Sequence, residues 1–211
     1  MFTFAASPFE IPSTIADMCR DTWAGIAMPG CAWSGSDRVA IARRARAERL
    51  GADPLADHLP PAAQEAVRVL AATPAATSRE WVQEVVAAIG EPAYVELLGL
   101  VARVVAVDTF TRLVGVAPEP LPQPHRGQPI PVAPHGPLER DATWVAITGS
   151  PVPPNLLSLV PAAQAETNAT AEALYMTGAQ MESPDTTIDG LHRTQIEIVA
   201  TCVSHANDCF Y

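Results

Sequence analysis

A glutamate and a cysteine near the end of the chain form the pattern best suited to chemistry. Glu197 lies twelve positions before Cys209, and the segment between them contains Cys202 and His205. Cysteine reacts as its thiolate, and a helix N-terminus lowers the pKa of a thiol because free N–H groups and the positive end of the helix dipole face the sulfur. A carboxylate whose pKa is raised by burial can accept the thiol proton. The segment is therefore the first candidate for a redox site.

The residues around Cys209 predict its place relative to a helix. Asn207 and Asp208 are poor helix-interior residues but good turn and N-cap residues. We therefore expect a helix over about residues 188–206 and Cys209 at the start of a new helix. The carboxylate of Asp208 works against a low pKa for the Cys209 thiol.

A glutamate, eleven residues, and then Cys-x-x before a second thiol or selenol resembles the active-site pattern of the alkylhydroperoxidase D-like (carboxymuconolactone decarboxylase-like) family. The similarity is strongest over residues 193–211. It implies an all-α fold of two related helical halves that forms homo-oligomers. It also implies a peroxidase that reduces hydroperoxides with electrons from a dithiol donor and needs no metal, flavin or haem.

The same resemblance implies roles for individual residues. Glu197 would be the carboxylate of a proton relay, Cys209 the resolving thiol, and His205 an outer member of the thiol site. The peroxidatic cysteine or selenocysteine would be residue 212, with a relay histidine beyond it, and the printed sequence stops at Tyr211. We expect the gene to continue through a UGA codon for selenocysteine, and an ordinary sense codon or a TAA or TAG stop there would contradict this reading. A chain that ends at Tyr211 should have little or no peroxidase turnover and an exposed apolar surface where later helices would dock.

Three alternatives remain open. Cys209 can be an incidental thiol, and Cys202 a small core residue. On a continuous helix Cys202, His205 and Cys209 would share a face, so that with His192 they would make a zinc site. The chain can also be a non-catalytic helical module of the same ancestry that serves oligomerisation or binding.

Helices separated by proline-rich connections account for most of the remaining sequence, with little β alternation. Twelve of the 21 prolines lie between Pro118 and Pro161, which excludes regular helix there. This divides the chain into an N-terminal half without the cysteine motif (1–115), a connection (116–154) and a C-terminal half (155–211). Helices are expected over residues 12–27, 38–50, from 60, from 78, 93–113, 156–159, 162–181 and 188–206.

The helix over residues 93–113 is apolar on nearly all sides, which predicts a central, buried position. Its Glu96 and Arg103 lie seven residues apart on one stripe. Neutralisation of both charges by other partners is favoured over catalysis.

Charge and cysteine content limit the function. The net charge of −10 argues against a general nucleic-acid binder, because phosphate contacts dominate that affinity. A local group of arginines is interpreted as a solvated helix face: Arg38, Arg43, Arg44, Arg46 and Arg49. Four cysteines are interpreted as buried thiols and one reactive site rather than a disulfide framework. No segment has the features of a membrane span or signal peptide, so we expect a cytoplasmic protein with no membrane partner.

Overall fold

The computed structural model describes residues 2–54 and 56–207. The chain divides into two compact units, Met1–Thr170 and Ala171–Tyr211. The described residues are mainly helical and contain only four two-residue strands, so the expected all-α class is confirmed.

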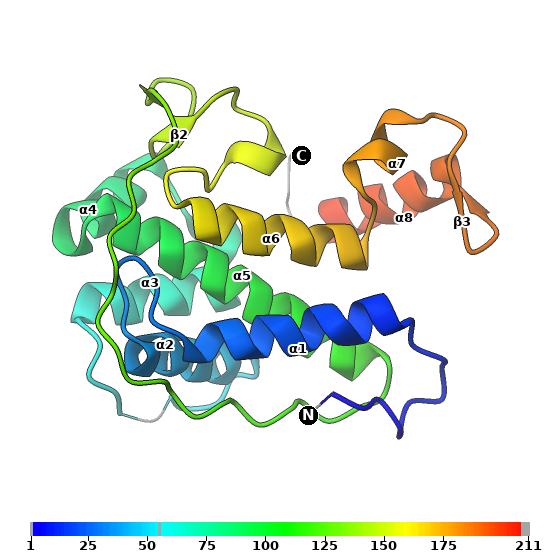
Figure 1. The fold of residues 1–211 in the computed structure, drawn as a ribbon, viewed down its shortest axis with the longest axis horizontal. Coiled ribbons are helices and arrows are strands. Elements are labelled where there is room, and N and C mark those ends of the chain that lie inside the picture. Colours follow the sequence, from blue (N-terminus) through cyan, green and yellow to red (C-terminus); the bar gives the residue numbers. More distant parts are fainter. Residues whose placement is uncertain (1, 55, 208–211) are drawn as a thin grey trace. The chain divides into compact units, whose positions relative to one another are not determined.

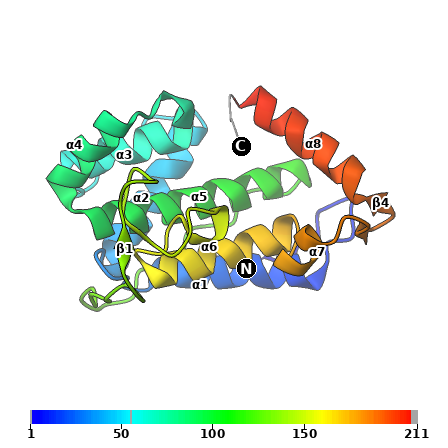
Figure 2. The ribbon, with the colours of Figure 1, turned by 90° about the horizontal axis from the view of Figure 1, so that it is seen from above.

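The first unit is built around one central helix, α5 (Glu91–Leu113). Its Leu97, Leu100 and Val104 have no exposed surface. Apolar residues occur on every side of α5 because other elements cover it all round, as the sequence predicted. Its neighbours are α1 (Ser13–Ala27), α2 (Gly35–Arg49), α3 (Pro61–Ala72) and α4 (Arg79–Ile89). In both ribbon views α1, α5 and α6 (Pro161–Leu174) lie side by side (Figures 1 and 2).

The helix starts follow from local capping chemistry. Ser34 caps α2 by accepting a hydrogen bond from the Asp37 N–H, and the Asp37 carboxylate in turn accepts from the Ser34 N–H at 2.9 Å. Ser78 caps α4 in the same way by accepting from the Trp81 N–H at 3.2 Å. Serine favours both helix starts because its hydroxyl accepts from N–H groups that the first helical turn leaves free.

The proline-rich segment after α5 lies against α1 and the loop that follows it. The Trp23 indole donates to the Pro120 carbonyl at 3.0 Å, and the His125 N–H donates to the Ala27 carbonyl at 2.8 Å. The Ile130 N–H donates to the Gly30 carbonyl at 2.9 Å. These bonds tie the segment to the first unit along its first half.

Short strands and turns complete the connection. The segment forms a hairpin from β1 (Leu138–Glu139) and β2 (Ile147–Thr148). The expected helix at residues 156–159 is replaced by turns and by the 3₁₀ turn η2 (Pro153–Asn155). Another 3₁₀ turn, η1 (Pro74–Ala76), joins α3 to α4.

As far as residue 207, the second unit contains the end of α6, two further helices and a hairpin. The expected helix over residues 162–181 is interrupted, so that α6 ends at Leu174 and a separate α7 (Gly178–Glu182) follows. The hairpin of β3 (Thr187–Ile188) and β4 (Leu191–His192) precedes α8 (Arg193–Ala206). The last helix therefore starts five residues later than expected but ends at the expected Ala206.

Candidate functional site

Glu197 lies in the second turn of α8, where two side chains hold its carboxylate. The Tyr175 hydroxyl donates to Oε2 at 3.0 Å, and Arg193 Nε donates to Oε1 at 3.3 Å from one turn earlier on the same helix. The Glu197 side chain is 44% exposed. Glu197 is therefore an oriented, half-exposed carboxylate and not a buried one.

Tyr175 keeps its proton and so acts as the donor in this pair. Burial and the hydrogen bond to Glu197 raise the pKa of Tyr175 above its usual value near 10. The Tyr175 hydroxyl therefore stays protonated across the physiological range and fixes the direction of one carboxylate oxygen.

A hairpin turn and a cap fix where α8 begins. Asp189 and Gly190 have φ values of 48° and 83°, as a tight two-residue turn requires. His192 caps α8 by accepting from the Thr194 N–H, and the Gln195 side chain accepts from the His192 N–H at 2.9 Å. His192 is therefore engaged in the helix start.

Two other residues of the candidate segment, Cys202 and His205, lie further along α8. His205 lies in the last turn of α8 and is exposed. Cys202 is exposed as well, so its expected role as a core residue is wrong. Cys209 lies outside the described residues. Among residues 2–54 and 56–207, no group of three or more His, Cys, Asp and Glu side chains is placed to hold a metal ion.

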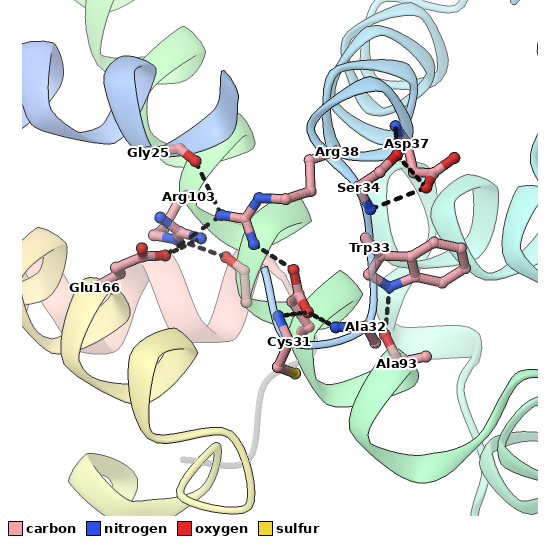
Figure 3. Close-up of polar contacts among 12 residues, drawn as sticks. Gly25, Cys31, Ala32, Trp33, Ser34, Asp37, Arg38, Ala93, Arg103 and Glu166 are labelled. Atoms are coloured by element: carbon pink, nitrogen blue, oxygen red, sulfur yellow. Dashed lines mark hydrogen bonds and ion pairs between the residues drawn. The ribbon is translucent and has the colours of Figure 1, made fainter. Parts of the chain in front are cut away.

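A second polar constellation, which we call the buried charge cluster, lies in the first unit (Figure 3). It consists of Arg38 from α2, Glu96 and Arg103 from α5, and Glu166 from α6. Arg38 Nη1 pairs with Glu96 Oε1, and Arg103 Nη2 lies 2.5 Å from Glu166 Oε2. Arg38 Nη2 also lies 3.7 Å from Glu166 Oε2, which joins the two pairs. The four side chains carry balanced charge.

The cluster also holds the loop between α1 and α2. The N–H groups of Cys31 and Ala32 donate to Glu96 Oε2 at 2.9 and 2.8 Å. Gly30 makes this approach possible, because a Cβ there would lie 1.7 Å from Glu96 Oε1. Beside the loop the Trp33 indole donates to the Ala93 carbonyl at 2.8 Å. Glu96 is therefore a side-chain acceptor that fixes the loop onto α5.

Burial changes the acid–base behaviour of the groups around the cluster. Desolvation, followed by the Glu96 carboxylate, raises the pKa of the Cys31 thiol to about 12. Desolvation lowers the pKa of Arg103 to about 10, against the opposing effect of Glu166. In another part of the same unit, burial raises the pKa of Cys19 to about 11. Cys31 is protonated at neutral pH, which is the opposite of what a nucleophilic thiol requires.

The cluster corrects one prediction and confirms another. Arg38 is only 4% exposed and is paired, so it does not belong to a solvated helix face. Glu96 and Arg103 are neutralised by other partners, as expected. What the sequence did not indicate was Glu166, which pairs with Arg103 although the proline-rich segment separates the two residues along the chain.

The other arginines of α2 are divided between paired and exposed positions. Arg44 and Arg46 pair with Asp57 and Asp108. Arg43 and Arg49 are exposed. The expected solvated face is therefore correct only for these last two.

Neither family models nor curated proteins nor solved structures yield a match to this chain. In the part of the chain that the structure describes, no single helix is long and apolar enough to cross a membrane; α4 and α5 pass such a test only together, and they meet at a bend of 114°.

Proposed function

We propose that the protein reduces hydroperoxides through a thiol or selenol pair, with Glu197 as proton acceptor and Cys209 as resolving thiol. The observation that carries this proposal is the state of Glu197. Its carboxylate is open to solvent, held by Tyr175 and Arg193, and located on a helix that ends three residues before Cys209. A solvent-accessible, oriented carboxylate can pass a proton between a reacting group and water.

The proposed cycle transfers two electrons to each hydroperoxide molecule. A thiolate or selenolate attacks the terminal oxygen of ROOH, the O–O bond breaks, and RO⁻ takes a proton to leave as an alcohol. The attacking atom becomes a sulfenic or selenenic acid. The Cys209 thiolate, after passing its proton to Glu197, then attacks this acid and forms a disulfide or selenenylsulfide. The S–O or Se–O bond breaks, and the departing hydroxide takes the proton back from Glu197 and leaves as water. A dithiol donor returns two electrons and restores both groups.

The decisive assay uses the chain extended by one cysteine after Tyr211. Consumption of hydrogen peroxide and cumene hydroperoxide is followed with dithiothreitol as the electron donor. We expect Cys209→Ser to abolish turnover and Glu197→Gln to lower it by about 10²-fold or more, since a positioned base contributes on that scale. Glu172→Gln is the matched control, because Glu172 is an exposed carboxylate of the same unit. Turnover that is indifferent to Cys209→Ser and Glu197→Gln would remove the proposal.

A further substitution tests whether Tyr175 positions the base. Tyr175→Phe removes the donor to Glu197 Oε2 and should lower kcat with little change in KM, because Tyr175 positions the base and does not bind the peroxide.

A second candidate function, a non-catalytic oligomerisation module, is favoured by the surface of α8. Ile198, Val199 and Val203 are 63%, 60% and 57% exposed. Exposed apolar residues on one helix are typical of protein–protein contacts. Light scattering should show Val199→Glu with Val203→Glu dissociating an oligomer, while Thr201→Glu on the same helix leaves it intact. Dissociation by these substitutions, together with no peroxide consumption by the extended chain, would favour this second function over the first.

A further inference from the structure

Glu166 is the partly exposed member of the buried charge cluster. Its side chain is 37% exposed, whereas those of Arg38 and Arg103 are 4% and 1% exposed. Figure 3 shows both guanidinium groups beside the Glu166 carboxylate. Arg38 belongs to α2 and Arg103 to α5, so the donors are carried by helices other than α6, which carries the carboxylate. The two arginines form an anion site, and Glu166 occupies it.

Other bonds hold both guanidinium groups in position. Arg38 Nη1 pairs with Glu96 Oε1, and Arg38 Nη2 donates to the Gly25 carbonyl at 3.1 Å. Arg103 Nε donates to the Gly99 carbonyl at 3.1 Å, one turn earlier on α5. None of these bonds involves α6, so both arginines would keep their places without it. Two guanidinium groups and one carboxylate would then remain, and the single positive charge that is left matches a monoanion.

The geometry of Glu166 leaves some of these donors poorly used. Arg103 Nη2 and Glu166 Oε2 lie 2.5 Å apart as an ion pair, but Nη2 makes no aligned hydrogen bond within the described part of the chain. Arg38 Nη2 lies 3.7 Å from the same oxygen, which is beyond hydrogen-bond distance. An arginine holds a carboxylate most strongly through two parallel hydrogen bonds. A carboxylate that is not attached to a helix can rotate to form them.

The part of α6 that belongs to the first unit, residues 161–170, is weakly anchored. The buried residues of α6 are few and mainly polar: Ala163, Gln164 and Thr170. Thr167 Oγ1 is buried and has no hydrogen-bond partner among the described residues, which costs free energy. Leu157 and Leu159 are buried just before the helix. The start of α6 is therefore held by apolar contacts, whereas the turn that contains Glu166 depends on the ion pair.

We propose that Arg38 and Arg103 form a binding site for a small monocarboxylate, which Glu166 occupies as a tethered ligand. A free carboxylate that takes the place of Glu166 releases residues 161–170 from α5. A tethered group competes at an effective concentration on the order of millimolar, so the unaltered chain responds only to high concentrations of free carboxylate. The proposal is independent of the hydroperoxide chemistry, because all residues of that cycle lie outside Met1–Thr170.

Acetate is the probe, because Glu166→Ala removes from the site the same heavy atoms that one acetate ion contains. The amide signals of Cys31 and Ala32 are the reporters in ¹⁵N NMR, since both N–H groups bind Glu96 in the same cluster. Acetate should give saturable shifts at both residues in the variant at constant ionic strength. Methyl acetate lacks the charge and should bind at least about tenfold more weakly. The unaltered chain should need at least about tenfold more acetate than the variant.

Hydrogen exchange followed by mass spectrometry reports the release of α6 without any substitution. In the unaltered chain, saturating acetate should speed exchange of residues 161–170 by at least about tenfold, while the amides around Leu100 of α5 stay slow. Glu166→Ala should exchange as fast in this segment before acetate is added. Sodium chloride at the same ionic strength is the control and should have little effect, because salt screens buried ion pairs weakly.

Two variants separate the anion site from a general effect of charge. Glu172→Ala removes an exposed carboxylate from the same helix and should leave both the exchange of residues 161–170 and the acetate response unchanged. Glu166→Ala combined with Arg103→Met removes one charge of each sign. This double variant should remain folded by far-UV circular dichroism and bind acetate at least about tenfold more weakly than Glu166→Ala, since it lacks one charged donor.

Three results would overturn the proposal. The first is the absence of saturable acetate shifts at Cys31 and Ala32 in folded Glu166→Ala. The second is equal affinity of that variant for acetate and methyl acetate. The third is exchange of residues 161–170 in the unaltered chain that acetate changes no more than sodium chloride does.

Discussion

Replacing Glu96 by glutamine tests whether the negative charge of Glu96 in the buried charge cluster stabilises the first unit. The substitution keeps the size of the side chain but removes the negative charge that faces Arg38, whose side chain is 4% exposed. Arg38 then has one remaining carboxylate oxygen, Glu166 Oε2 at 3.7 Å. The single amide oxygen must also serve the Cys31 and Ala32 N–H groups. Because removing one member of a buried ion pair costs about 3–5 kcal/mol, we expect the free energy of unfolding to fall by that amount.

Urea unfolding measured by tryptophan fluorescence checks this value, since Trp23 and Trp33 are both buried in the first unit. Glu65→Gln is the matched control. Glu65 also pairs with an arginine, Arg68, but both side chains are 48% exposed, so the control should lose less than about 1 kcal/mol. Arg38→Met combined with Glu96→Gln should lose less than the two single changes added together, by at least about 1 kcal/mol, because the double change removes both charges of the pair.

Two outcomes would refute this reasoning. One is an equal loss of stability in Glu96→Gln and Glu65→Gln, which would mean that burial of the pair does not matter. The other is strict additivity of Arg38→Met and Glu96→Gln, which would mean that the two side chains do not interact.

Three further predictions concern the loop before α2 and the thiols. Gly30→Ala should destabilise the protein by about 1–3 kcal/mol in the same urea assay, because its Cβ would overlap Glu96, whereas Gly178→Ala has open space and should be nearly neutral. At pH 8, mass spectrometry should show iodoacetamide modifying exposed Cys202 well before Cys19 and Cys31, whose pKa values of about 11 and 12 leave little thiolate. Since the unfolded chain releases these thiol protons near pH 9, stability should also fall as the pH rises from about 9 toward 12. Rapid modification of Cys31 in the folded protein would contradict its burial against Glu96.

The sequence alone predicted the positions of most helices of the first unit. The central helix was expected over residues 93–113 and spans Glu91–Leu113, because apolar residues on nearly all of its sides leave a strong signal. The caps Ser34 and Ser78 lie within one turn of the N–H groups from which they accept, so a local sequence pattern can indicate them.

Local signals were overlooked in the second unit. Asp189-Gly190 is the dipeptide that favours a two-residue hairpin turn, and it explains why α8 starts at Arg193 rather than near residue 188. Thr177 and Gln180 form a capping box, which starts α7 and so divides the expected helix over residues 162–181. Both features could have been found from the sequence.

The buried charge cluster could not have been found from the sequence. Arg38 belongs to an arginine-rich stretch that is typical of a solvated surface, and its partner Glu96 lies 58 residues away. Helical periodicity indicates which residues share a face, but it does not indicate which distant side chain neutralises a charge. The exposed state of Glu197 has the same origin, because burial depends on elements that pack from elsewhere in the chain.

The proline-rich segment after α5 has a practical consequence for anyone who wishes to produce the helices of the first unit as a shorter protein. Cutting the chain after Leu113 would remove the carbonyls of Glu119 and Pro120, which accept hydrogen bonds from Arg46 and Trp23. It would also remove the N–H donors of His125 and Ile130, which bind the carbonyls of Ala27 and Gly30. Prolines reduce the conformational entropy that such a segment loses on folding, so ordering it costs little free energy. A shortened protein should therefore include Ile130 and extend at least to Glu166, the partner of Arg103.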